Sequence, residues 1–262
     1  MSSPRSDSPQ TTGLDAKDLI VPDWPAPSRV KALFTTRAGG VSNGAFGSLN
    51  LGARVGDAAV DVEENRRRLL VLLPSSPVWL NQIHGIEIVD AARVTPAGQA
   101  SLAADASFTT QINVPCTVLV ADCLPVLFCT ADGSCVAAAH AGWRGLHRGI
   151  LEQTVAAMHT KSDNILAWLG PAIGPLAFEV GDDVFKAFTE LTPQDAYAFK
   201  PAANGSRKYF ADIYELARLR LQRAGVSKIF GGQFCTVRDA DRFFSYRRDG
   251  MTGRMGAVIW RE

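Results

Sequence analysis

The stretch TVLVADCLPVLFC, residues 117–129, contains two apolar runs that are separated by a short break. Apolar runs of this length, rich in β-branched residues, are typical of buried β-strands. They predict strands over residues 117–121 and 126–129, with Asp122 and Cys123 at the break between them. Functional side chains gather at strand ends, so this break is the first candidate for a functional site.

Hydrophobic periodicity outside this stretch predicts further strands and helices. Short apolar runs indicate strands at residues 30–36, 78–82, 87–91, 135–140, 165–169, 228–230 and 256–260. Helical spacing indicates helices at residues 57–73, 145–159, 180–191 and 211–224. Because strands and helices mix without strict alternation, we predict one α/β (α+β) domain, a layered sandwich with mixed sheets.

The N-terminal part of the chain has a different composition. Residues 1–27 are rich in Ser, Thr, Pro and Asp, which predicts a flexible leader before a catalytic domain at residues 28–262; residues 19–21 can dock on that domain as a first strand. The first residues lack the apolar core of a signal peptide. No run reaches the roughly 18 apolar residues that span a bilayer. We therefore expect a cytoplasmic protein with no membrane partner.

Charge and cysteine content narrow the function further. The chain has 27 basic and 26 acidic side chains, which gives no electrostatic reason to expect nucleic acid as a partner. Its five cysteines should be reduced in the cytoplasm, where each is core filler, a ligand or a nucleophile. We assign Cys116, Cys129 and Cys135, which lie in or beside apolar strands, to the core and leave Cys235 open.

Two of the four histidines lie, like Cys123, at predicted strand ends beside glycines. His84 ends NQIH before Gly85, and His140 precedes AGWRG. A catalytic zinc ion keeps three Cys, His or carboxylate ligands and leaves a fourth position for water or substrate. His84, Cys123 and His140 meet that count. Their wide spacing is not diagnostic, so buried His and Cys side chains without a metal remain an alternative.

A second chemical interpretation uses some of the same atoms without a metal. Cys123 would be a nucleophile, His140 its general base, and Asp122 the group that orients the histidine. This interpretation leaves His84 without a role, whereas the metal site uses all three side chains.

Several motifs, in order along the chain, resemble the YfiH-like family. The segments are FTTRAGGVS with SLNLG, NQIHG, ADCLPVLF, AAAHAGWRG, LGPAIGP and FFSYRRDGMTGRMG, and the resemblance runs from about residue 30 to the C-terminus. Members of this family were long labelled multicopper polyphenol oxidoreductases, or laccases, and are now mostly described as purine nucleoside phosphorylases that also deaminate adenosine. The resemblance implies a CNF/YfiH-like fold and one zinc ion bound by His84, Cys123 and His140, with water or phosphate as the fourth ligand.

The resemblance also implies a reaction. Adenosine, inosine, guanosine or methylthioadenosine would react with inorganic phosphate to give the free base and the pentose 1-phosphate, and adenosine would be deaminated as a side activity. Zinc can orient a phosphate oxygen or activate water for such steps. The nearest candidate carboxylates for proton transfer are Asp122 first and Glu179 second.

Candidate contacts to the substrates follow from residue chemistry. Phosphate needs fixed cations with several donors, for which Arg144 and Arg37 are the first candidates and Arg247 the third. A surface ion pair is the alternative for each arginine, and it is our assignment for Arg248.

Polar and aromatic side chains complete the predicted substrate site. Gln82 and Asn50 are candidates to hydrogen-bond the nucleoside, or else to cap turns. Phe178 and Phe244 are candidates to stack on the purine, or else to pack in the core. The expected partners are therefore a purine nucleoside and inorganic phosphate, bound by a monomer or a weak homodimer.

Three rival functions use the same residues. Copper-dependent phenol oxidation by a multicopper enzyme needs many histidines. This chain has four, and we expect two of them, His147 and His159, to lie on the surface. A single copper ion could still replace zinc. A hydrolase could act on peptidoglycan precursors through Cys123 and His140. The third rival is a zinc-stabilised scaffold for partners, which is not an enzyme. It is disfavoured because a structural zinc site normally has four protein ligands, and the sequence offers three.

Overall fold

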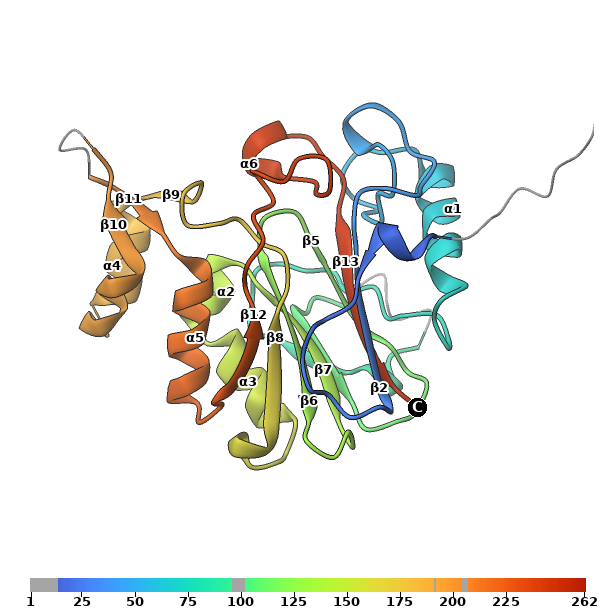
Figure 1. Cartoon of the computed structure of the whole chain (residues 1–262), viewed down its shortest axis with the longest axis horizontal. Coiled ribbons are helices and arrows are strands. Elements are labelled where there is room, and N and C mark those ends of the chain that lie inside the picture. Colours follow the sequence, from blue (N-terminus) through green and yellow to red (C-terminus); the bar gives the residue numbers. More distant parts are fainter. Residues whose placement is uncertain (1–13, 96–101, 191, 204–206) are drawn as a thin grey trace, which may run out of the picture.

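The computed structural model describes residues 14–95, 102–190, 192–203 and 207–262, which form β-sheets with helices packed around them (Figure 1). The mixed, layered α+β architecture predicted from the sequence is confirmed. Within the described residues, no helix is both long and apolar enough to cross a membrane.

The largest sheet is six-stranded, and it lies at the centre of the fold. Its order is β12 (Lys228–Gly231), β8 (Ile165–Leu169), β6 (Leu124–Thr130), β7 (Val136–Ala141), β4 (Ala106–Thr109) and β3 (Ile88–Asp90). Strands β6 and β7 form an antiparallel hairpin, and every residue of the two strands is buried. Both faces of the hairpin are therefore covered, which explains why its sequence is apolar without alternation.

A four-stranded antiparallel sheet covers one face of the central sheet. Its order is β1 (Leu19–Ile20), β2 (Val30–Thr35), β13 (Met255–Arg261) and β5 (Cys116–Val120). Phe34 and Val118 of this sheet share a buried cluster with Leu127 and Trp168 of the central sheet. Helix α1 (Ala59–Leu70) lies on its outer side, where Leu69 packs in a third cluster.

Helices cover the other face of the central sheet. They are α2 (Trp143–Arg148), α3 (Ile150–Ala157) and α5 (Ile213–Arg223), and their apolar residues join the largest buried cluster. A small sheet with the order β10 (Phe199–Pro201), β11 (Lys208–Ala211) and β9 (Glu179–Gly181) projects from this side together with α4 (Asp182–Thr189) (Figure 1). The ring of Phe185 in α4 stacks on Tyr209 of β11 with 4.2 Å between ring centroids.

Two predicted elements differ in the structure. The predicted helix at 145–159 is two helices, because Gly149 has a φ of 99° that ends α2 before α3 begins. The predicted helix at 180–191 starts as β9 and becomes α4 only at Asp182, and residue 191 lies outside the described residues.

The predicted strand at 78–82 is wrong. Its residues make one isolated bridge, between Asn81 and Ala103. The side chain of Gln82 instead pairs with the backbone of Leu119, accepting its N–H at 2.7 Å and donating to its carbonyl at 2.8 Å. An amide side chain thus completes the free edge of β5, and no backbone strand is needed there.

The predicted leader is packed over its second half. Residues 1–13 lie outside the described residues, but Leu14 and Ile20 are buried and β1 pairs with β2. Chain packing therefore starts by Leu14, ahead of the predicted boundary at residue 28. The three cysteines assigned to the core, Cys116, Cys129 and Cys135, are buried as expected.

Candidate metal centre and active site

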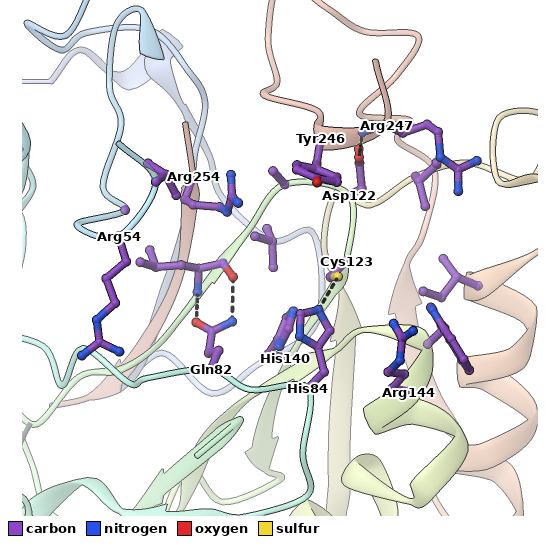
Figure 2. Close-up of a pocket in the computed structure, with 18 of the residues that line it drawn as sticks. Arg54, Gln82, His84, Asp122, Cys123, His140, Arg144, Tyr246, Arg247 and Arg254 are labelled. Atoms are coloured by element: carbon purple, nitrogen blue, oxygen red, sulfur yellow. Dashed lines mark hydrogen bonds between the residues drawn. The ribbon is translucent and has the colours of Figure 1, made fainter. Parts of the chain in front are cut away.

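The three predicted metal ligands meet at one end of the central hairpin. Cys123 lies directly before β6, His140 lies in β7 opposite Pro125, and His84 lies in the loop before β3. Their ligand atoms lie within 4.8 Å of one another, and Cys123 Sγ lies 3.7 Å from His84 Nε2 (Figure 2). A tetrahedral zinc ion would hold sulfur and nitrogen ligands roughly 3.6 Å apart. The cluster thus fits one zinc-sized ion.

A buried carboxylate, Asp105, holds both histidines. Its Oδ1 lies 2.7 Å from His140 Nδ1, which leaves the other ring nitrogen of His140 for a metal. Its two oxygens also accept the backbone N–H groups of Ile83, His84 and Gly85 at 2.7–3.1 Å. These contacts support a loop in which His84 has a positive φ of 58°. Metal-binding histidines commonly have such a carboxylate partner.

The charges of the cluster suit a soft cation. Burial raises the pKa of the Cys123 thiol, but the neighbouring His140 and His84 lower it by more, to about 6. Burial lowers the pKa of His140, but Cys123 and Asp105 raise it to about 9. In the metal-free protein, Cys123 is therefore mostly a thiolate at neutral pH and His140 is protonated. The thiolate is the form that binds metals and also the form that attacks as a nucleophile.

Gly142 gives the cluster its space. A Cβ atom at this position would lie 2.7 Å from His84 Cδ2 and 3.1 Å from Cys123 Sγ. The chain can therefore pass from β7 to α2 beside the ligands only because residue 142 has no side chain.

The cluster opens into a pocket of about 1010 Å³ whose walls differ in character. Figure 2 shows Arg54 and Arg254 on one side of the three ligands and Arg144 on the other. Apolar side chains form much of the lining, namely Trp143, Ile173, Phe178, Val180, Val184 and Ile213. The pocket therefore offers both cations for an anion and a surface for a flat, apolar group.

Arginines Arg66 and Arg254 are fixed by the protein. Arg66 donates two hydrogen bonds to the Leu51 carbonyl and stacks on Trp79, with its guanidinium 4.1 Å from the ring centroid. Arg254 donates from Nη1 to the carbonyls of residues 252 and 253. Burial lowers the pKa of Arg254 and lowers that of Arg66 to about 10, so both stay charged at neutral pH. Held cations of this kind suit phosphate.

Four of the seven predicted substrate-binding residues line the pocket, namely Gln82, Arg144, Phe178 and Arg247. The guanidinium of Arg144 stacks on Trp143 at 4.3 Å from the ring centroid. That of Arg247 lies 5.6 Å from the centroid of the Phe178 ring. The amide of Gln82 is engaged by Leu119, so its contacts support the wall of the pocket.

The other three predicted residues lie outside the pocket lining. Arg37 donates to the backbone carbonyls of residues 47 and 240, and it stacks on Phe244, which is fully buried. Asn50 is also fully buried, and its Oδ1 accepts the backbone N–H groups of Gly52 and Arg254. The polar groups of Arg37 and Asn50 are thus used within the protein, where they stabilise loops beside the basic wall of the pocket, formed by Arg54, Arg66 and Arg254.

Four residues of the site were not predicted from the sequence, namely Asp105, Arg54, Arg66 and Arg254. Asp105 lies in the mostly apolar segment LAADASF. Burying an acidic side chain there costs free energy unless it is paired, so its position in this segment was the sequence signal for a function. Arg66 is the first of three consecutive arginines in helix α1, at residues 66–68. Arg67 and Arg68 do pair with Glu64 in α1, but Arg66 turns to the pocket.

The remaining histidines do not join the cluster. His159 is exposed, as expected. His147 is half-buried with its ring 5.5 Å from Phe188, so the expectation of a surface position holds only for His159. Among the described residues, the group that could hold a metal is His84, Cys123 and His140.

We expect Asp105→Asn to weaken zinc binding by about 10- to 100-fold, because His140 loses the carboxylate that orients its ring. Chelator competition on the purified variant measures this loss, with circular dichroism to verify folding. Asp163→Asn, which changes an exposed aspartate outside the pocket, should bind zinc like the unaltered protein. A folded Asp105→Asn variant with full zinc affinity would contradict the role given to this carboxylate.

Zinc binding should also release a defined number of protons. At about pH 7.5, the Cys123 thiol, with its pKa of about 6, has already lost its proton, whereas His140, with its pKa of about 9, has not. Binding should therefore release about one proton, and affinity should fall more steeply below about pH 6, where the thiol must ionise too. Calorimetry in two buffers of different ionisation enthalpy measures the number, and release of two protons at pH 7.5 would refute this charge state.

Comparison with known proteins gives a consistent result. Residues 31–262 match the family model described as multi-copper polyphenol oxidoreductase laccase. A Pseudomonas aeruginosa protein named purine nucleoside phosphorylase is 53% identical over 243 residues, which cover 92% of this chain and 97% of that protein. Escherichia coli YfiH, also named purine nucleoside phosphorylase, is 53% identical over 244 residues, covering 92% and 98%.

Solved structures agree with this result. A Neisseria meningitidis protein is 51% identical with a TM-score of 0.88, covering 94% of this chain and 99% of that one. YlmD from Geobacillus stearothermophilus is 34% identical with a TM-score of 0.82, covering 90% and 93%. The chain therefore belongs to the multicopper polyphenol oxidoreductase (laccase) family, the family of the YfiH-type proteins.

Proposed function

We propose that this protein is a zinc-dependent purine nucleoside phosphorylase that also deaminates adenosine. Adenosine, inosine, guanosine and methylthioadenosine are the proposed nucleosides, and inorganic phosphate is the second substrate. The observation that carries the proposal is a Cys-His-His cluster that opens into a pocket with basic and apolar lining. The names of the relatives that are 53% identical support the same reaction.

Zinc is the proposed metal because the donor set has borderline-soft character and three members. When bound, the ion supplies a Lewis acid with an open position, which can orient a phosphate oxygen or polarise water. Asp105 and Gly142 shape this position from the protein side, the first by orienting His140 and the second by leaving room beside Cys123. The five unpaired cysteines suit the proposed cytoplasmic location.

The walls of the pocket suggest how the substrates lie. The purine base would pack on the apolar side, against Trp143 and Phe178. Phosphate would bind on the basic side, where Arg66 and Arg254 can donate charge-assisted hydrogen bonds. The pentose then lies between them, so that a phosphate oxygen bonds to the anomeric carbon as the N-glycosidic bond breaks. The base departs with the electron pair and takes up a proton.

Copper-dependent phenol oxidation is less well supported, although the family description names it. Multicopper oxidases need several copper centres rich in histidine. This chain has four histidines, and His147 and His159 lie outside the cluster. A single copper ion could replace zinc there, because copper binds such sites more tightly.

The proposal is tested by incubating the purified zinc-loaded protein with adenosine, with and without inorganic phosphate, and separating the products by chromatography. We expect ribose 1-phosphate with adenine or hypoxanthine when phosphate is present, and inosine when it is absent. Removing the metal with a chelator should lower both rates at least about 100-fold, and added zinc should restore them. Unchanged nucleosides with zinc confirmed in the protein would refute the proposal.

Two variants within that experiment separate the metal mechanism from a cysteine hydrolase. The Cys123 thiolate could act as a nucleophile with His140, but this mechanism does not need His84. His84→Ala and Cys123→Ser should therefore both lose zinc and activity. Full activity in His84→Ala together with a loss in Cys123→Ser would favour the hydrolase.

The basic wall can be tested by Arg254→Gln, which removes one charged donor. We expect the KM for phosphate to rise about 10- to 100-fold, because a hydrogen bond to a charged group contributes about 1.5–3 kcal/mol. The KM for the nucleoside should change little in steady-state kinetics. Arg67→Gln, which alters an exposed arginine paired with Glu64, is the matched control. An equal rise in both KM values would mean that Arg254 supports the whole pocket.

A further inference from the structure

Asp122, the neighbour of the ligand Cys123, has both carboxylate oxygens engaged by the protein. The Thr236 hydroxyl donates to Oδ1 at 2.5 Å, and the backbone N–H of Arg247 donates to Oδ2 at 2.6 Å. We propose that Asp122 is a positioning residue that fastens helix α6 (Tyr246–Asp249) over the pocket, and that it is not the proton shuttle of the reaction. The inference rests on the proposed function for its kinetic readout.

The contacts of Asp122 join parts of the chain that are far apart in sequence. Thr236 is 114 residues away and Arg247 is 125 residues away. The backbone carbonyl of Asp122 also accepts the N–H of Ile173 at 2.9 Å. Asp122 has a φ of 85°, which a residue with a side chain keeps only where its surroundings hold it. The turn that carries Cys123 is therefore built around these contacts.

Arg247 extends the connection from Asp122 to the apolar wall. Its guanidinium donates from Nη1 to the carbonyls of Ala177 and Glu179, at 3.1 and 3.0 Å. The same group lies over the ring of Phe178, which lines the pocket. A shift of the Arg247 backbone would thus move the wall against which we place the purine.

The direction of the carboxylate argues against proton transfer. Figure 2 shows Asp122 turned to Arg247 in α6, whereas Cys123 below it turns to the histidines. A general acid or base must lie within hydrogen-bond reach of the group that gains or loses the proton. Both oxygens of Asp122 instead point to donors that hold the fold.

Arg248 reinforces the same attachment independently. It donates from Nη1 to the carbonyls of Thr236 and Val237, and from Nη2 to the carbonyl of Phe243. The α6 segment therefore keeps several anchors when Asp122 is altered. Variants at position 122 should therefore fold, and their main effect should be on the position of Tyr246 and Arg247.

The test compares Asp122→Asn with Asp122→Ala in the zinc-loaded enzyme. An amide can take over both contacts, because its oxygen accepts the N–H of Arg247 while its N–H₂ donates to the Thr236 hydroxyl. It cannot shuttle a proton. We expect Asp122→Ala to raise the KM for the nucleoside about 10-fold or more, and Asp122→Asn to restore it to within about threefold. The pH profile of kcat should keep its shape in both variants.

Two further measurements make the outcome decisive. Thr236→Val, which leaves residue 122 intact, should reproduce part of the rise in KM. Hydrogen exchange over residues 243–251 should be faster in Asp122→Ala than in Asp122→Asn, a result that does not require phosphorylase activity. An inactive unaltered protein with this exchange pattern would refute the proposed function and leave the positioning role intact.

The opposite result would overturn the inference. If Asp122→Asn were as damaged as Asp122→Ala, with kcat down about 100-fold and one limb of the pH profile lost, Asp122 would be the proton shuttle. Equal exchange rates in all variants would show that Asp122 does not hold α6. Asp163→Asn is the control for replacing an aspartate and should match the unaltered protein in every measurement.

Discussion

The carboxylate of Asp105 is the group on which the geometry of the centre depends. It holds the ring of His140 and three successive backbone N–H groups of the loop that carries His84. Burying a carboxylate is costly unless donors replace the lost water, and here four donors do so. The same contacts that stabilise the buried charge also place two ligands. The geometry of the centre is therefore set by contacts within the protein.

The pocket exists only because three sheets meet beside this centre. Arg254 lies directly before β13 of the four-stranded sheet, and His140 lies in β7 of the central sheet. The small sheet contributes Glu179 and Val180 in β9. Basic and apolar walls thus come from different layers of the fold. In the proposed function, a nucleoside and a phosphate would be held on opposite sides of the candidate metal site, because each layer presents its own chemistry.

A buried polar network keeps the basic wall in place. Asn65 in α1 donates to the Ser42 hydroxyl and to the carbonyls of Ser48 and Asn50, and its oxygen accepts the N–H of Val41. Asn50 in turn accepts the N–H of Arg254. Buried amides of this kind hold a loop in one conformation, because each lost contact leaves an unsatisfied polar group. Polar residues that resemble ordinary loop residues in the sequence therefore help to position the guanidinium of Arg254.

The sequence by itself determined the strands around residues 117–141, the candidate cluster of His84, Cys123 and His140, and the family, because periodicity and motifs are local properties. Only the tertiary structure decided that Gln82 closes a sheet edge, that Arg66 faces the pocket while Arg67 does not, and that Asp122 holds α6. Each of these outcomes depends on partners brought close by folding. The sequence specifies the type of each residue. The direction in which a side chain points is set by neighbours that lie far away along the chain.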